Sequence, residues 1–154
     1  MPLDREDIYG ALYQRLQDKV PSIVQWSRKE LNFDDVADNG CPACVMLITD
    51  QSAELSDHQG LPPKWRLGAA LIIYARASGN LSPDEVLNHV LDEIEAALER
   101  QPGEPIGVEQ NWETNLGGRV QRVYYTGVVT FVAGTQGGVD GSVIVPVEML
   151  ATVP

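Results

Sequence analysis

The sequence has few cysteines, few aromatic residues, little positive charge and no long apolar run. Its two cysteines, Cys41 and Cys44, are too few for the disulfide framework of a small secreted protein. No stretch reaches the roughly 18 apolar residues of a membrane span; the nearest, residues 67–77, is interrupted by Gly68 and Arg76. The first residues are acidic and polar, unlike a secretion signal, so we expect a cytoplasmic protein with no membrane contact.

Positive charge is scarce, because 11 Lys and Arg stand against 22 Asp and Glu, a formal net charge of −11. Affinity for phosphates comes from clustered Lys and Arg, so this balance argues against specific nucleic-acid binding. The same charge suits a protein that DNA slides past without binding. A chain of 154 residues, 44% apolar and 21% charged, predicts a single domain (1–154) whose core needs neither disulfides nor metals.

Two segments have the apolar spacing of amphipathic helices. The first runs over residues 4–20, with Asp4 as its N-cap and Pro21 after its end. The second begins at Ser82, which forms a capping box with Glu85, and ends before residues 101–103. The apolar stripe of this second helix consists of Val86, Leu87, Val90, Leu91, Ile94 and Leu98.

Period-two alternation predicts strands over 23–31, 43–49, 65–77, 119–133 and 143–149. The predicted apolar face is Trp65, Leu67, Ala69, Leu71 and Ile73 on the third of these strands and Val143, Val145, Val147 and Met149 on the last. Gly127 indicates a bulge or bend, and Pro146 predicts that the last strand lies at a sheet edge. The order α-β-β-β-α-β-β predicts an α+β domain in which two helices pack on a largely antiparallel sheet. Residues 50–64 and 134–141 are interpreted as loops, either simply flexible or ordered by contacts on assembly.

The spacing of Cys41 and Cys44 is the one motif that suggests chemistry. A redox pair needs a helix that starts at its first cysteine, but this one runs into a predicted strand. A zinc site could add His58 and His89 to the cysteines, although the two histidines are too far apart for a finger. We therefore interpret Cys44 as a core residue and Cys41 as a loop thiol, and expect no cofactor, no metal and no enzymatic activity. A small redox or zinc-binding protein remains the alternative from a different class.

Several short segments follow one another in a recognisable order over nearly the whole chain. They are an acidic helical start (5–16), a short strand approach followed by Pro42-Ala43 and an apolar strand (36–47), the long strand from Pro63-Lys64-Trp65 to Ile73-Tyr74-Ala75, residues 91–98 of the second helix, and Asn115-Leu116-Gly117-Gly118-Arg119-Val120 before a valine-rich strand. This arrangement resembles the tail terminator proteins, also called minor tail or tail completion proteins, of long-tailed bacteriophages.

The resemblance implies a structural role without catalytic residues. Such proteins form a homohexameric ring that caps the finished tail tube, stops its polymerisation and presents a surface to the head-completion protein. The expected partners are therefore further copies of the chain, the tail tube protein and the head-completion protein. The expected location is the head-proximal end of the virion tail, with assembly in the host cytoplasm. A neck or head-closure component, and a host-derived binding module, are the alternatives.

Charge and glycine content suggest which residues would serve such a ring. Candidate assembly contacts are Arg28, Lys29, Arg119, Arg122, Gly134, Gly137, Gly138 and Asp140. Candidate channel-facing acids are Asp92, Glu95, Glu109 and Glu113. The basic residues would pair with acids of neighbouring subunits or of the tube, and the acids would keep passing DNA from binding. The alternative is that these charges only form a solvated surface.

Overall fold

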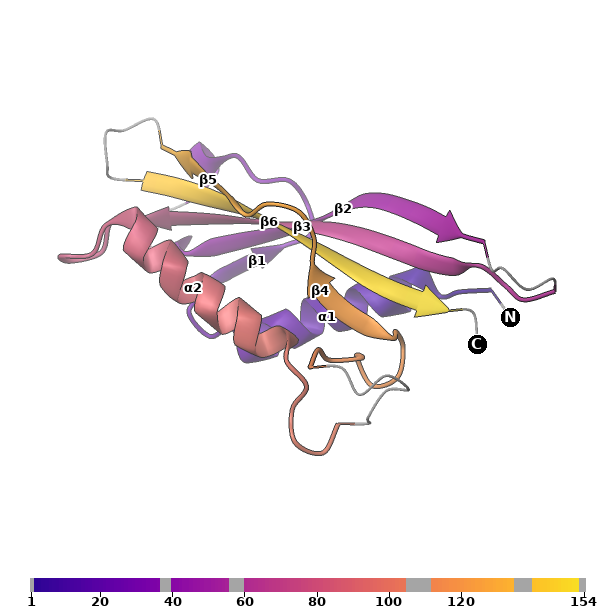
Figure 1. Ribbon diagram of the computed structural model, residues 1–154. Helices are drawn as coiled ribbons and strands as arrows, with labels where there is room; N and C mark the ends of the chain where they lie inside the picture. The colour runs from indigo at the N-terminus through magenta and orange to yellow at the C-terminus, as the bar shows by residue number, and fades with distance from the viewer. Residues whose placement is uncertain (1, 37–39, 56–59, 105–111, 135–139, 153–154) are drawn as a thin grey trace.

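The computed structural model describes residues 2–36, 40–55, 60–104, 112–134 and 140–152. Two α-helices, a short 3-10 helix and six strands follow one another along the chain (Figure 1). In order, they are α1 (Arg5–Lys19), β1 (Gln25–Ser27), η1 (Phe33–Asp35), β2 (Ala43–Glu54), β3 (Lys64–Arg76), α2 (Pro83–Leu98), β4 (Arg122–Tyr125), β5 (Thr130–Ala133) and β6 (Asp140–Thr152).

The six strands form one mixed sheet with both α-helices on the same face (Figure 1). The strand order is β1-β2-β3-β6-β4, and β5 also pairs with β6. Only the β1–β2 pairing is parallel; the other pairings are antiparallel. The predicted α+β class, with two helices on a largely antiparallel sheet, is confirmed.

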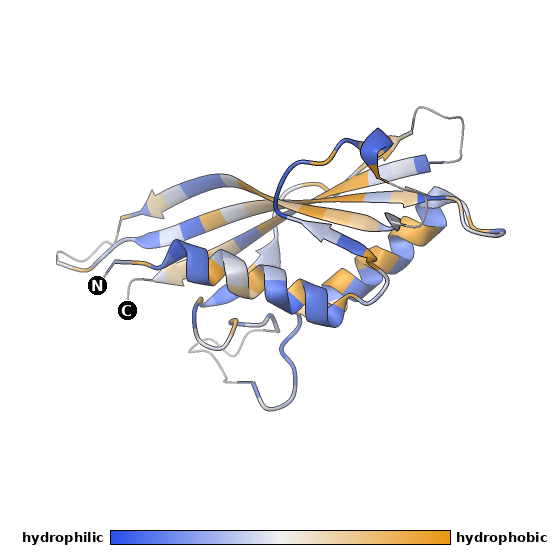
Figure 2. Ribbon diagram, turned by 180° about the vertical axis from the view of Figure 1, so that it is seen from behind, coloured by the Kyte–Doolittle hydropathy of each residue, from blue (hydrophilic) through white to orange (hydrophobic). Residues whose placement is uncertain are grey.

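The pairing of β3 with β6 runs over all thirteen residues of each strand. Because side chains alternate across a strand, this register places one set from each strand beneath the helices. The buried set is Leu67, Ala69, Leu71, Ile73 and Ala75 of β3 with Val143, Val145, Val147, Met149 and Ala151 of β6. Apolar residues of both helices belong to the same core, and apolar and polar residues alternate along the ribbons of both helices (Figure 2). The predicted core faces of these two strands are confirmed.

Both helices begin as predicted. The Asp4 carboxylate accepts a hydrogen bond from the backbone N–H of Asp7 at 3.0 Å, and Ser82 and Glu85 form the capping box of α2. Four residues of the predicted α2 stripe are buried: Leu87, Val90, Ile94 and Leu98. Val86 and Leu91 only border the core, so the stripe is narrower than predicted. Among the described residues, no helix is long and apolar enough to cross a membrane.

The strand predicted over 23–31 is wrong in length, since only the three residues of β1 pair. The chain then turns through η1 and packs on the sheet face opposite the helices. Phe33 lies 5.4 Å from Tyr74 between ring centroids, and the Tyr74 hydroxyl donates to the Leu31 carbonyl at 3.0 Å. These tertiary contacts, together with the turn-forming Asn and Asp residues at 32, 34 and 35, override the local strand preference.

The β2–β3 hairpin is longer than predicted, because β2 continues to Glu54, into the first third of the segment 50–64 interpreted as a loop. The register between the two strands shifts between Ile48 and Gln51, which marks a bulge. Gly68 lies opposite the bulge, where an added Cβ would stand 2.5 Å from the Thr49 hydroxyl oxygen. Only glycine therefore fits at this close approach of the two backbones.

The edge position predicted from Pro146 is wrong, because β6 has neighbours on both sides. The neighbour on one side is interrupted between β4 and β5, where Gly127 has a φ of +74°. Thr126 donates its N–H to the Pro146 carbonyl at 3.2 Å. In an antiparallel strand, the N–H and the carbonyl of one residue point toward the same neighbouring strand. The N–H that Pro146 lacks would therefore point toward the side on which β4 and β5 are interrupted. The bend predicted at Gly127 is confirmed, and it divides the predicted strand 119–133 into two.

Leu87 and Leu91 provide a matched test of which face of α2 is buried. Leu87→Ala should lower the free energy of unfolding by about 2–5 kcal/mol, because it empties a fully buried site. Leu91→Ala should cost only about 1 kcal/mol, as Leu91 merely borders the core. Urea unfolding of both variants measures the difference. Equal losses would contradict the assigned packing of α2.

Candidate assembly surface

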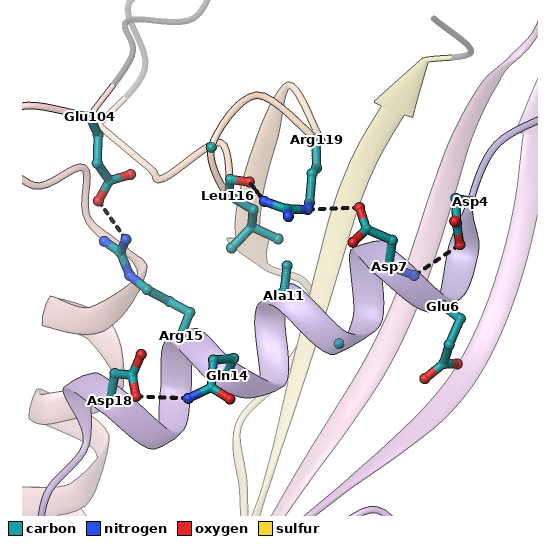
Figure 3. Close-up of a pocket in the computed structure, with 12 residues that line it drawn as sticks. Asp4, Glu6, Asp7, Ala11, Gln14, Arg15, Asp18, Glu104, Leu116 and Arg119 are labelled. Atoms are coloured by element: carbon teal, nitrogen blue, oxygen red, sulfur yellow. Dashed lines mark hydrogen bonds and ion pairs between the residues drawn. The ribbon is translucent and has the colours of Figure 1, made fainter.

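A groove of about 830 Å³ runs along the outer side of α1 (Figure 3). Its apolar part consists of Gly10 and Ala11 on the helix and Leu116 on the loop that precedes β4. Charged side chains border it, among them Arg15 and Arg119. The groove is therefore a shallow apolar strip between charged walls, built where α1 meets the chain that follows α2.

Arg15 fixes one end of the groove by binding the end of the other helix. Its Nε donates to the Ala97 carbonyl and its Nη2 to the Glu99 carbonyl, each at 2.8 Å. The last carbonyls of a helix have no partner within the helix and carry partial negative charge. The last turn of α2 contains no basic residue of its own. A cation on α1 therefore satisfies the end of α2.

Glu104 extends this contact to the segment after α2. Its carboxylate forms an ion pair with Arg15 and accepts hydrogen bonds from the Thr114 hydroxyl at 2.7 Å and the Gln101 N–H at 3.1 Å. Burial alone would raise the pKa of Glu104, but these hydrogen bonds and the Arg15 charge hold it below its ordinary value. The folded state therefore favours the ionised carboxylate.

Arg119 fixes the loop at the other end of the groove. Its Nε donates to the Asp7 carboxylate at 2.8 Å and its Nη1 to the Leu116 carbonyl at 3.0 Å (Figure 3). Both partners of the ion pair are about half exposed, at 44% and 51%, so the pair contributes little to stability. Its effect is to hold Leu116 beside α1, which gives the groove its apolar wall.

Gly10 lies inside α1, where a glycine costs about 0.5–1 kcal/mol relative to alanine. An added Cβ at Gly10 would meet no heavy atom of the described residues within 4 Å. No contact in this part of the chain therefore requires glycine here. Sequence reasoning missed Gly10 and Arg15; the glycine inside a helical pattern was the one available signal.

Three arginines predicted as assembly contacts bind carboxylates of their own chain. The ion pairs are Arg28 with Glu6, Arg119 with Asp7, and Arg122 with Glu113. Glu113, predicted to face a channel, is thus partly neutralised by its neighbour. Lys29 is exposed just after β1. Contacts of these residues with other subunits remain predictions.

The remaining predicted residues fall into three groups. Asp92 and Glu95 are exposed on α2, where the amphipathic spacing places them, and their position toward a channel remains a prediction. Asp140 is buried against Gly134, where an added Cβ would stand 1.9 Å from the Asp140 carboxylate. This pair closes the base of the β5–β6 connection. Gly137, Gly138, Glu109 and His58 lie outside the described residues.

The two cysteines differ in burial, because Cys44 packs in the core and Cys41 lies nearer the surface. Cys44 is fully buried in the core, and this burial raises the pKa of its thiol. Cys41 is half-buried and lines a hollow of about 350 Å³ together with His89. Over the described ranges, no group of three or more His, Cys, Asp or Glu side chains could hold a metal ion. The interpretation of Cys44 as a core residue is confirmed.

The chain is similar to a known protein in its structure, whereas the comparisons of sequence found no match. No protein-family model and no curated protein matches the chain. A chain in the solved structure titled "Virion of native gene transfer agent (GTA) particle" has the same fold, with a TM-score of 0.53 and 7% identity. The match covers 94% of this chain and 93% of that one.

Gly10→Ala should stabilise the protein. The alanine Cβ enters open space, and the unfolded chain loses conformational freedom, so the free energy of unfolding should rise by about 0.5–1 kcal/mol. Thermal and urea unfolding measure the change. A loss of stability would show that the groove is closed in solution.

Glu104→Gln should alter how stability depends on pH. Because the folded-state pKa of Glu104 lies below its ordinary value of 4.5, its contribution is complete above that value and is lost as pH falls through the lower folded-state pKa. The variant should therefore be less stable than the wild type at pH 7, and this deficit should shrink on acidification. A deficit independent of pH would contradict the assigned ion pair.

Proposed function

We propose that this chain is a structural component of a phage-like virion and that it forms a homohexameric ring at the head-proximal end of the tail. There it would cap the tail tube, end its polymerisation and bind the head-completion protein. The observation that supports this most is the whole-chain likeness to a chain of a gene transfer agent virion. The match covers nearly all of both chains, so it relates two complete folds and not a shared fragment.

The sheet face opposite the helices supports a role in assembly. Beyond the part that η1 covers, it presents apolar side chains, with Ile144 exposed by 37% and Val132 by 45%. Leu47, Ala70 and Ile72 lie half-buried on the same face. A protein that works alone rarely leaves such a sheet face open, whereas a ring subunit can cover it with a neighbour.

The groove on α1 supports a second contact. Its floor at Gly10 and Ala11 has almost no side chain, so the backbone of another subunit can approach closely. In this proposal the glycine serves the assembled ring, although it weakens the isolated helix. Asp92, Glu95, Glu109 and Glu113 would add negative charge along the channel, so that passing DNA is not held.

Native mass spectrometry tests the ring. The purified protein, alone or with the tail tube protein, should give a closed species of six chains. Gly10→Leu should remain folded, because its side chain enters open space, yet it should reduce the hexamer by filling the groove. Asn88→Ala, on an exposed position of α2, is the control and should assemble normally. A wild type that stays monomeric under both conditions would contradict the proposal.

A further inference from the structure

A second hollow, of about 310 Å³, lies where the end of α2 meets the sheet edge at β4. Aromatic side chains line it: Trp112, Tyr124 and Tyr125. Carboxylates also line it: Glu95, Glu99 and Glu113. It is separate from the groove on α1, and it shares Glu95 and Glu113 with the acids proposed to face the channel.

Trp112 is the most exposed tryptophan, at 87%. The other two are engaged, since Trp26 packs edge-on against Tyr13 and Trp65 lies under the Arg5 guanidinium at 4.5 Å. The backbone around Trp112 is nevertheless anchored. Its carbonyl accepts from the Arg100 N–H at 2.6 Å, and Thr114 donates its N–H to the Leu98 carbonyl at 2.7 Å. A large indole held outward on a fixed backbone is typical of an interaction surface.

One wall of the hollow already binds a guanidinium. Arg122 lies 4.4 Å over the Tyr124 ring and forms an ion pair with Glu113 at 2.9 Å. Glu95 and Glu99 form no ion pair with any described residue, and no described cation stacks on Trp112 or Tyr125. Burial raises the pKa of the Tyr125 hydroxyl, and the charges of Glu95 and Asp92 raise it further. The hollow thus combines aromatic faces with unneutralised negative charge.

We propose that this hollow binds an arginine side chain from a basic, extended segment of a partner protein. The guanidinium would stack on Trp112 and pair with Glu95 and Glu99, repeating the arrangement that Arg122 shows beside it. The outer edge of β4, which pairs with no other described strand, would let the segment lie alongside in extended form. A second copy of the chain is a poor donor, since it has a net charge of −11 and most of its arginines bind their own chain.

The chemistry selects arginine over other groups. Its planar guanidinium can stack on an indole and donate to two carboxylates at once, whereas a lysine ammonium acts as a point charge. A phosphate would be repelled by the same carboxylates. The inference stands whether or not the ring forms, because every residue that it uses belongs to one subunit.

The test uses the three tryptophan indole N–H signals in a ¹⁵N–¹H spectrum of the full chain, assigned with Trp112→Phe. The probe is a short acetylated and amidated peptide with two arginines, and its matched control has citrulline at both positions. The arginine peptide should shift the Trp112 signal alone, more weakly as salt is raised, and the citrulline peptide should not. Equal shifts with both peptides, or no shift at millimolar peptide, would overturn the proposal.

Variants then separate the aromatic and the acidic contributions. Trp112→Ala should weaken binding of the arginine peptide by about threefold to tenfold. The double variant Glu95→Gln with Glu99→Gln should weaken it by at least a similar factor, and Glu30→Gln, an exposed acid elsewhere, should leave it unchanged. Unchanged Trp26 and Trp65 signals verify that each variant is folded. Undiminished binding by the double variant, or tighter binding of a phosphorylated peptide, would contradict the assigned chemistry.

Discussion

The pairing of β3 with β6 along their full length is the constraint on which the rest of the structure depends. It sets which side chains point toward the helices, and a shift by one residue would turn every one of them to the other face. The two α-helices then pack on one continuous layer of side chains. The bulge of β2 lies opposite Gly68, and the gap between β4 and β5 lies opposite Pro146, so neither interrupts the β3–β6 pairing. The hydrophobic core therefore lies on the helix side of the sheet, and neither α-helix covers the opposite face.

One arginine of α1 binds the end of α2 and so ties the two helices together. α2 begins with acids and a capping box but ends without a cation, and Arg15 from α1 supplies the missing charge. Through Glu104 and Thr114 the same side chain holds the segment that leads from α2 toward β4. That segment forms the wall of the groove on α1 and also presents Trp112. The groove on α1 and the hollow at Trp112 are therefore positioned by the contact of Arg15 with Glu104, which is largely buried.

Local patterns were enough to predict the two helices, the α+β class and the core faces of β3 and β6, because these depend on caps and on spacing within one segment. Local patterns failed where contacts between residues far apart in the sequence determine the structure. Pro146 lies inside the sheet because the neighbouring strand is interrupted opposite it, and 23–31 turns away after three paired residues because Phe33 packs on Tyr74. The contact of Arg15 with Ala97 spans 82 residues, so no local pattern could reveal it. Of the residues that line the groove, the sequence pointed to Arg119, predicted as an assembly contact, and to Gly10, a glycine inside a helix.

These features describe a protein whose hydrophobic core lies on one face of the sheet and whose other surfaces are the ones proposed to bind partners. The central claim is that those partners belong to a phage-like virion and that six copies form a ring at the end of the tail. Cryo-electron microscopy of the phage-like particles purified from cells that produce this chain tests it most directly. The account predicts density for six copies of this fold between the tail tube and the head. Its presence along the whole tube, or its absence from the particle, would contradict the account.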